Sequence, residues 1–159
     1  MKFSKEQALQ KAKHYCAYQE RCHTEVKEKL HALGVPRSEA ETILASLIEE
    51  GYLDEERFAK QFAGGKFRMN HWGKRKIEAE LRTRGVSPYC IRKGLAEIPE
   101  ADYMATLEKL ARDHLKDKHS WEARAKTTNY LLQKGYESDL IARVLAAPDP
   151  RAGRNADLS

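Results

Sequence analysis

The stretch Leu81-Arg82-Thr83-Arg84-Gly85-Val86 occurs in two further versions, Leu30-His31-Ala32-Leu33-Gly34-Val35 and Leu131-Leu132-Gln133-Lys134-Gly135-Tyr136. The three glycines are separated by 51 and 50 residues, so the pattern marks an internal repeat. In each version the glycine follows apolar residues at helical spacing, and such a glycine typically caps a helix in the left-handed conformation. We therefore predict a helix, a glycine turn and a second helix in each repeat.

A further helix is expected before each of these pairs, over residues 5–21, 54–67 and 102–117. No segment alternates apolar and polar residues long enough to predict a strand. The fold class is therefore all-α, with nine helices in three tandem three-helix repeats. Modules this small bury little surface alone, so we expect them to stack into an elongated, curved array. The expected divisions are repeats 1–50, 51–98 and 99–147, followed by a disordered, proline-containing tail, 148–159.

Several helix starts carry their own signals. Ser4 and Gln7 have the spacing of a capping box. Asp54 precedes two glutamates, whose negative charge stabilises the N-terminus of the following helix. Ser87 is followed by Pro88, and this pair is typical of a helix start in which serine is the N-cap and proline is the first helical residue.

Composition restricts the class of protein. The chain has 159 residues, 29 Lys and Arg, 24 Asp and Glu, and a net charge of +5. Its start has no secretion signal, and its longest apolar run, 43–48, is too short to span a bilayer. Three cysteines, Cys16, Cys22 and Cys90, are too few for a disulfide framework. We expect a cytoplasmic protein with reduced thiols and no membrane partner.

Motifs for catalysis are missing from the sequence. Gly64-Gly65-Lys66 lacks the earlier glycine and the following Ser or Thr of a phosphate-binding loop. The histidines and cysteines at 14, 16, 22 and 23 match no usual zinc spacing. No nucleophile elbow or nucleotide fingerprint occurs. We therefore expect no enzymatic activity, no cofactor and no metal.

Positive charge is concentrated in the middle of the chain. Residues 57–93 contain eleven basic and two acidic residues, a local charge of +9, so the remainder carries −4. This segregation is typical of a surface that binds phosphate or an acidic protein. Alternatively, these basic residues form only a solvated helical face. We favour a binding role for them.

Within this segment, residues 66–76 interleave aromatic and basic side chains, as nucleic-acid and protein contact surfaces both do. Phe67 and Trp72 are also suited to the core of the middle repeat, and we favour that role for both aromatics. The candidate residues for contact with nucleic acid or an acidic protein partner are Lys66, Arg68, Trp72, Lys74, Arg75, Lys76, Arg82 and Arg84.

The second repeat opens with Gly51-Tyr52-Leu53-Asp54-Glu55-Glu56-Arg57-Phe58-Ala59 and continues through residues 72–86, from Trp72-Gly73-Lys74-Arg75-Lys76 to Gly85-Val86. These two long stretches resemble the RecX family. Residues 124–136 are similar too, so the resemblance covers nearly the whole chain. The chain departs from the family pattern in two places. Leu33, before the first repeated glycine, stands where the family commonly has a basic residue, and Gly64-Gly65 should weaken the first helix of the second repeat.

The resemblance implies a regulator that lies in the groove of the RecA recombinase filament on single-stranded DNA. The resemblance also implies that this regulator limits growth of the filament and inhibits its strand exchange, its ATP hydrolysis and the SOS repressor cleavage that it stimulates. As partners we expect this filament and, weakly, single- or double-stranded DNA, and we expect a monomer. Two alternatives stay open: a sequence-tolerant DNA-binding module, because the repeated turn resembles a helix-turn-helix, and a generic helical-repeat adaptor.

Overall fold

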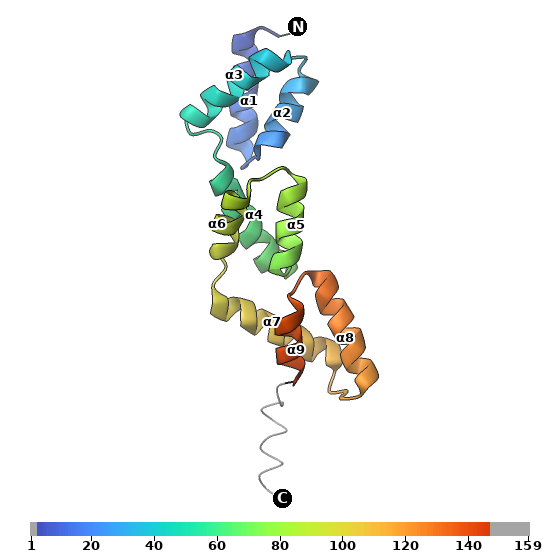
Figure 1. The fold of residues 1–159 in the computed structure, drawn as a ribbon. Coiled ribbons are helices and arrows are strands. Elements are labelled where there is room, and N and C mark those ends of the chain that lie inside the picture. The colour runs from blue at the N-terminus through green and yellow to red at the C-terminus, as the bar shows by residue number, and fades with distance from the viewer. Residues whose placement is uncertain (1–2, 147–159) are drawn as a thin grey trace, which may run out of the picture.

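The computed structural model describes residues 3–146, which form nine α-helices and no strand. The helices are α1 Lys5–Tyr18, α2 His23–Ala32, α3 Arg37–Glu49, α4 Glu55–Asn70, α5 Lys74–Thr83, α6 Pro88–Ala96, α7 Glu100–Leu115, α8 Trp121–Lys134 and α9 Ser138–Ala146. They are arranged as three bundles in a row, α1–α3, α4–α6 and α7–α9, here called the first, second and third bundles (Figure 1). The all-α prediction is confirmed.

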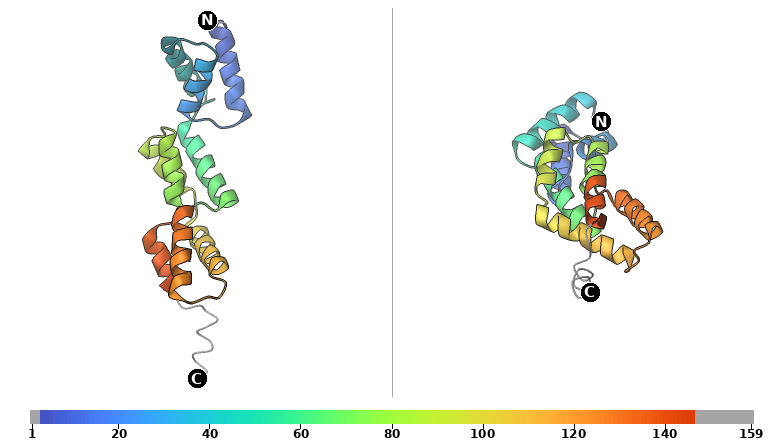
Figure 2. Two further views of the ribbon diagram at one scale, coloured as in Figure 1. Left: turned by 90° about the vertical axis from the view of Figure 1, so that its right-hand side faces the viewer. Right: turned by 60° about the horizontal axis from the view of Figure 1, so that its bottom comes forward.

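The bundles follow one another along one long axis (Figures 1 and 2). The repeat boundaries predicted at 50/51 and 98/99 lie in the connections between α3 and α4 and between α6 and α7. We keep the division into 1–50, 51–98 and 99–147 as a proposal. The predicted tail, 148–159, lies outside the described residues. Among residues 3–146, no helix has the length and apolarity needed to cross a membrane.

The three repeated glycines end the second helix of each bundle as predicted. Gly34, Gly85 and Gly135 have φ values of +79°, +77° and +101°. In each turn the amide after the glycine donates to the carbonyl of the repeated leucine, with N···O distances of 3.0, 3.0 and 3.1 Å. This six-to-one hydrogen bond defines a Schellman motif, so the sequence pattern specifies both the end of the helix and the direction of the next one.

The predicted helix starts are also confirmed. Ser4 and Gln7 form the reciprocal capping box, with distances of 2.9 and 3.1 Å. The side chain of Asp54 accepts a hydrogen bond from the backbone N–H of Arg57 at 3.0 Å. Ser87 caps α6 in the same way, and Pro88 is the first residue of that helix.

The first helix of each bundle differs by a few residues from its expected range. The helix α1 ends at Tyr18 rather than residue 21, and α7 begins at Glu100, directly after Pro99. The helix α4 continues through Gly64-Gly65 to Asn70, three residues beyond its predicted end. Its continuation is explained by packing, because α4 lies against α6 so closely that the missing side chain of Gly94 leaves room for the Ala59 carbonyl.

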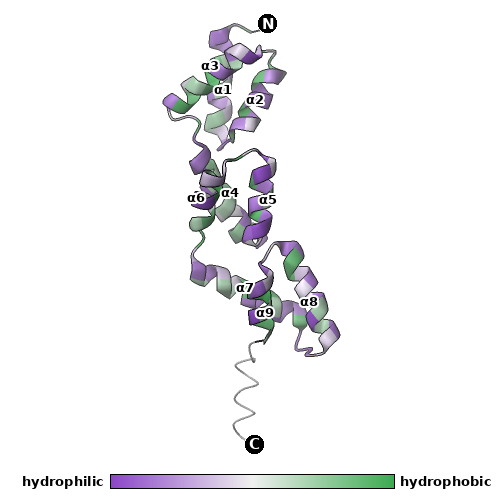
Figure 3. Ribbon diagram, in the orientation of Figure 1, coloured by the Kyte–Doolittle hydropathy of each residue, from purple (hydrophilic) through white to green (hydrophobic). Residues whose placement is uncertain are grey.

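Two hydrophobic cores hold residues 3–146 together. Hydrophilic and hydrophobic residues share each helix, as amphipathic helices require (Figure 3). One core lies in the first bundle and includes Val26, Leu30 and Leu47. The other runs without interruption from the second into the third bundle, so α4–α9 share one buried cluster. Its members are Cys22, Phe58, Ala59, Ala63, Phe67, Ile77, Leu81, Val86, Ile91, Ile98, Tyr103, Leu107, Ala111, Leu131, Tyr136 and Ile141.

The second and third bundles also meet backbone to backbone. Gly73 N–H donates to the Lys134 carbonyl at 2.8 Å, and Arg75 N–H donates to the Gly135 carbonyl at 2.9 Å. A Cβ atom on Gly73 would lie 2.3 Å from the backbone of Gly135, which leaves no space for a side chain. This junction therefore fixes the start of α5 against the end of α8.

Candidate functional site

All eight candidate contact residues lie in the second bundle, on or next to α4 and α5. Lys66 and Arg68 are in the last turns of α4, Trp72 is in the α4–α5 turn, and Lys74 to Lys76 form the first turn of α5. Arg82 is near the end of α5, and Arg84 is its C-cap residue. Arg68, Arg75 and Arg82 are exposed, whereas the other five candidates are half-buried. The α4–α5 turn and the helix ends beside it therefore carry five of the seven candidate cations, and Arg82 and Arg84 lie at the other end of α5.

Trp72 holds two of these cations in place. Its indole ring packs edge-on against Phe62, with the ring centroids 6.5 Å apart. The ammonium groups of Lys66 and Lys76 lie 4.9 and 4.5 Å from the centre of the same indole. Because the negative face of an aromatic ring attracts cations, this arrangement offsets the repulsion between two lysines that come from different helices.

The predicted core role of the two aromatics is therefore borne out to different degrees. Phe67 is 6% exposed and belongs to the core shared by the second and third bundles. Trp72 is half-buried and packs against that core with part of its ring. Its remaining surface lies among the candidate cations.

Ion pairs divide the seven candidate cations into two groups. Lys74 pairs with Glu100 at 3.2 Å, Arg82 with Glu78 at 2.8 Å, and Arg84 with Glu25 at 3.5 Å. Within residues 3–146, no carboxylate lies within 4.0 Å of the other four, which we call the unpaired cations: Lys66, Arg68, Arg75 and Lys76.

Lys74 has a structural role in addition to its charge. Its backbone N–H donates to the Tyr103 hydroxyl at 2.9 Å, and its ammonium lies 4.6 Å from the centre of that ring. The Tyr103 hydroxyl in turn donates to Glu137, and burial raises the pKa of this phenol well above its usual value. Lys74 therefore helps to join the second and third bundles, and its side chain is less available to a partner than that of Arg75.

The structure adds one cation that the sequence analysis missed. Lys134, at the end of α8, donates its ammonium to the Asn70 carbonyl at 2.9 Å. The two residues are 64 positions apart, so no local pattern could have indicated this contact. It extends the positive surface from the end of α4 onto the third bundle.

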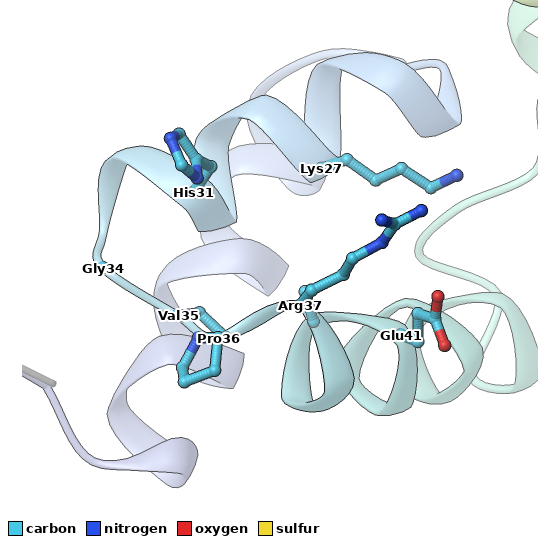
Figure 4. A pocket seen from close by; sticks show the side chains of 8 residues that line it. Lys27, His31, Gly34, Val35, Pro36, Arg37 and Glu41 are labelled. Carbon is cyan, nitrogen blue, oxygen red and sulfur yellow. The ribbon is translucent and has the colours of Figure 1, made fainter.

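A separate pocket of about 640 Å³ lies in the first bundle, between α2 and α3. The side chains of Lys27 and Arg37 extend toward the same side of the pocket, and Glu41 lies on the same helix as Arg37 (Figure 4). Because charges of both signs line this pocket, it does not continue the basic surface of the second bundle.

The described cysteines and carboxylates form no metal centre. Among residues 3–146, no three His, Cys, Asp or Glu side chains are grouped so that they could hold a metal ion. Cys16 and Cys22 are buried free thiols, and Cys90 is a half-buried one. The thiol and backbone N–H of Cys22 both lie within hydrogen-bonding distance of Glu25, at 3.2 and 3.4 Å.

Comparison with known proteins places this surface in a family context. Residues 54–95 match the family model described as RecX, second three-helix domain, and residues 102–145 match RecX, third three-helix domain. The regulatory protein RecX of Pseudomonas entomophila is 33% identical over 139 residues, which cover 84% of this chain and 86% of that protein.

A second relative is longer than this chain. The regulatory protein RecX of Geobacillus kaustophilus is 31% identical over 142 residues, which cover 87% of this chain and 53% of that protein. The chain thus spans about half the length of this relative and of others like it. The crystal structure of RecX from Lactobacillus salivarius has the same fold, with a TM-score of 0.81, 20% identity, and coverage of 98% of this chain and 97% of that one. The two domain matches and the Pseudomonas relative together show that the chain belongs to the RecX family of regulatory proteins.

Proposed function

We propose that this protein binds the RecA recombinase filament on single-stranded DNA and limits its growth. In this role it inhibits strand exchange, ATP hydrolysis and the coprotease activity of the filament. It acts as a monomer in the cytoplasm and catalyses no reaction itself. Membership of a family of regulatory proteins supports the proposal.

One observation carries the choice of surface: the unpaired cations gather around the α4–α5 turn and include the two lysines that flank Trp72. Like charges held together without counter-charges raise the free energy of the isolated protein, and a negatively charged partner removes that cost. A recombinase filament offers such charge on its DNA phosphates and on acidic protein side chains.

The elongated shape supports the same proposal. Bundles that follow one another along an axis (Figure 2) present several separate faces to a long partner. Contacts that are individually modest then add, because the first contact raises the effective concentration of the next. The ion-paired candidates Lys74, Arg82 and Arg84 contribute less in this account, since a partner must compete with a glutamate for each of them.

Binding to preassembled recombinase filaments tests the proposal. The protein should sediment with filaments, and this binding should weaken less with rising salt than its binding to naked DNA does. Its binding to naked DNA should fall steeply with salt, because phosphate contacts release counterions. Absence of filament binding at low salt would contradict the proposal.

The unpaired cations also favour a second candidate, a sequence-tolerant DNA-binding module, because lysine and arginine bind phosphate groups without reading sequence. That function predicts equal salt dependence for naked DNA and for filaments. A generic helical-repeat adaptor, in contrast, predicts no affinity for either.

A further inference from the structure

The two junctions between bundles differ in chemistry. The second and third bundles share a continuous apolar core and backbone hydrogen bonds at Gly73 and Arg75. The first bundle has a separate core. Cys22 enters the core of the second bundle, and Leu53, just before α4, enters the core of the first.

Three polar contacts join the first and second bundles at this junction. The Glu20 carboxylate pairs with Arg57, and Glu25 pairs with Arg84 at 3.5 Å. The backbone N–H of His23 donates to the Glu55 carboxylate at 3.3 Å. We call these three contacts the ionic latch. Such contacts weaken when salt screens the charges, whereas apolar packing and backbone hydrogen bonds do not.

Arg57 also contacts the segment that connects α3 of the first bundle to α4 of the second. Its guanidinium donates to the carbonyls of Gly51 and Tyr52 at 3.1 and 3.4 Å. Gly51 has a φ of +81° and ends α3 in a glycine turn. The connection from Gly51 to Asp54 is thus short and is fixed by a side chain that belongs to the latch.

Arg84 is the least completely satisfied member of the latch. Its guanidinium lies 5.0 Å from the centre of the Phe62 ring, and its contact with Glu25 is longer than an ordinary charged hydrogen bond. Its Nε atom is buried and has no hydrogen-bond partner among residues 3–146. A buried donor without a partner costs free energy, so this atom destabilises the contact between the first and second bundles.

We propose that the first bundle is a movable arm, which the ionic latch holds against a rigid unit formed by α4–α9. When the latch is weakened, the arm swings about the connection from Gly51 to Asp54 while the second and third bundles keep their arrangement. Arg84 belongs both to the latch and to the candidate contact surface. If the proposed function holds, an anionic partner that takes Arg84 from Glu25 also releases the arm.

Distance distributions between spin labels test the movable arm in the full chain. Labels attached to introduced keto amino acids leave the native cysteines in place. Exposed Ala45 on α3 and Ala96 on α6 report on the latched junction, and Ala96 with exposed Asn129 on α8 reports on the rigid one. Raising the salt concentration from about 0.1 M to about 1 M, which shortens the screening length to about 3 Å, should at least double the width of the 45–96 distribution. The 96–129 distribution should keep its width.

A charge-neutral variant tests the latch at low salt. Glu25→Gln removes the attraction for Arg84 but keeps an acceptor for the Cys22 amide, so α2 should retain its capping. It should broaden the 45–96 distribution about twofold at about 0.1 M salt. The matched control is Glu28→Gln, an exposed position on the same helix, which should leave the distribution unchanged. Unchanged widths in both tests, or equal broadening at both junctions, would overturn the proposal. Neither result depends on recombinase binding.

Discussion

At the scale of single residues, the repeated leucine and glycine have the clearest link between sequence and structure. Leu30, Leu81 and Leu131 are all fully buried, as the pattern predicted. Each also accepts the hydrogen bond that closes the glycine turn. Trp72 shows where such inference ends, because its ring lies partly in the core and partly among cations. The exposed fraction of an aromatic side chain depends on neighbours that sequence spacing does not identify.

Leu81→Ala should lower the free energy of unfolding by about 2 to 4 kcal/mol, because it leaves a cavity in the core shared by α4–α9. Leu132→Ala is a matched control on the third bundle, since Leu132 is 41% exposed, and it should cost less than about 0.5 kcal/mol. Urea unfolding of both variants provides the measurement. Similar losses would show that the helix faces are assigned wrongly.

Cys22 gives a prediction about alkaline pH. Burial raises the pKa of its thiol to about 11, from 9.0 for a free thiol. Between these values the unfolded chain loses the thiol proton and the folded chain keeps it, so the free energy of unfolding should fall as pH rises. Tyr103 and Tyr136, whose pKa values burial raises from 10.0, add to the loss at higher pH.

Cys22→Ser provides the control, because serine does not titrate in this range and is itself a favourable N-cap residue. Urea unfolding under reducing conditions between about pH 9 and pH 10 should show a smaller loss for the variant than for the natural chain. Equal losses would mean that the Cys22 thiol ionises as readily in the folded protein as in the unfolded chain.

At the scale of helices, the sequence predicted the order and number of the described elements, three N-caps and three glycine turns, because these depend on local signals. The serine, aspartate and glycine caps lie within a few residues of the groups that they satisfy. The ends of α1 and α4 were harder to predict, because they depend on packing between helices. Gly64-Gly65 illustrates this: the local helix propensity is poor, yet contact with α6 keeps α4 continuous.

Two glycine-to-alanine variants separate local propensity from packing. Gly65 lies inside α4, and a Cβ there would meet no atom within 4 Å, so Gly65→Ala should stabilise the protein by about 0.5 to 1 kcal/mol. A Cβ on Gly73 would lie 2.3 Å from the Gly135 backbone, so Gly73→Ala should destabilise it by about 1 to 3 kcal/mol. Thermal unfolding of both variants checks the signs. Stabilisation by Gly73→Ala would contradict the close approach of α5 and α8, and destabilisation by Gly65→Ala would contradict the open space beside Gly65.

At the scale of the whole molecule, the sequence predicted three repeats and their charge distribution but not how the bundles are joined. The contact between Gly73 and Gly135 and the hydrogen bond from Lys134 to Asn70 link residues more than 60 positions apart. The same limit applies to the candidate surface. Counting charge identified the α4–α5 region, but only the fold shows that Lys74 is tied to Glu100 and Tyr103 while Arg68, Arg75 and Lys76 have no carboxylate partner among the described residues.

Inhibition of RecA-dependent strand exchange tests the central claim most directly. The test variant reverses three unpaired cations, Arg68→Glu, Arg75→Glu and Lys76→Glu. The control reverses three exposed cations of the first bundle, Lys5→Glu, Lys27→Glu and Arg37→Glu, and so has the same net charge. At matched salt, with folding verified by circular dichroism, the control should inhibit like the natural chain, and the test variant should need at least about tenfold more protein. A folded test variant that inhibits strand exchange with undiminished potency would contradict the assignment of this surface to filament binding.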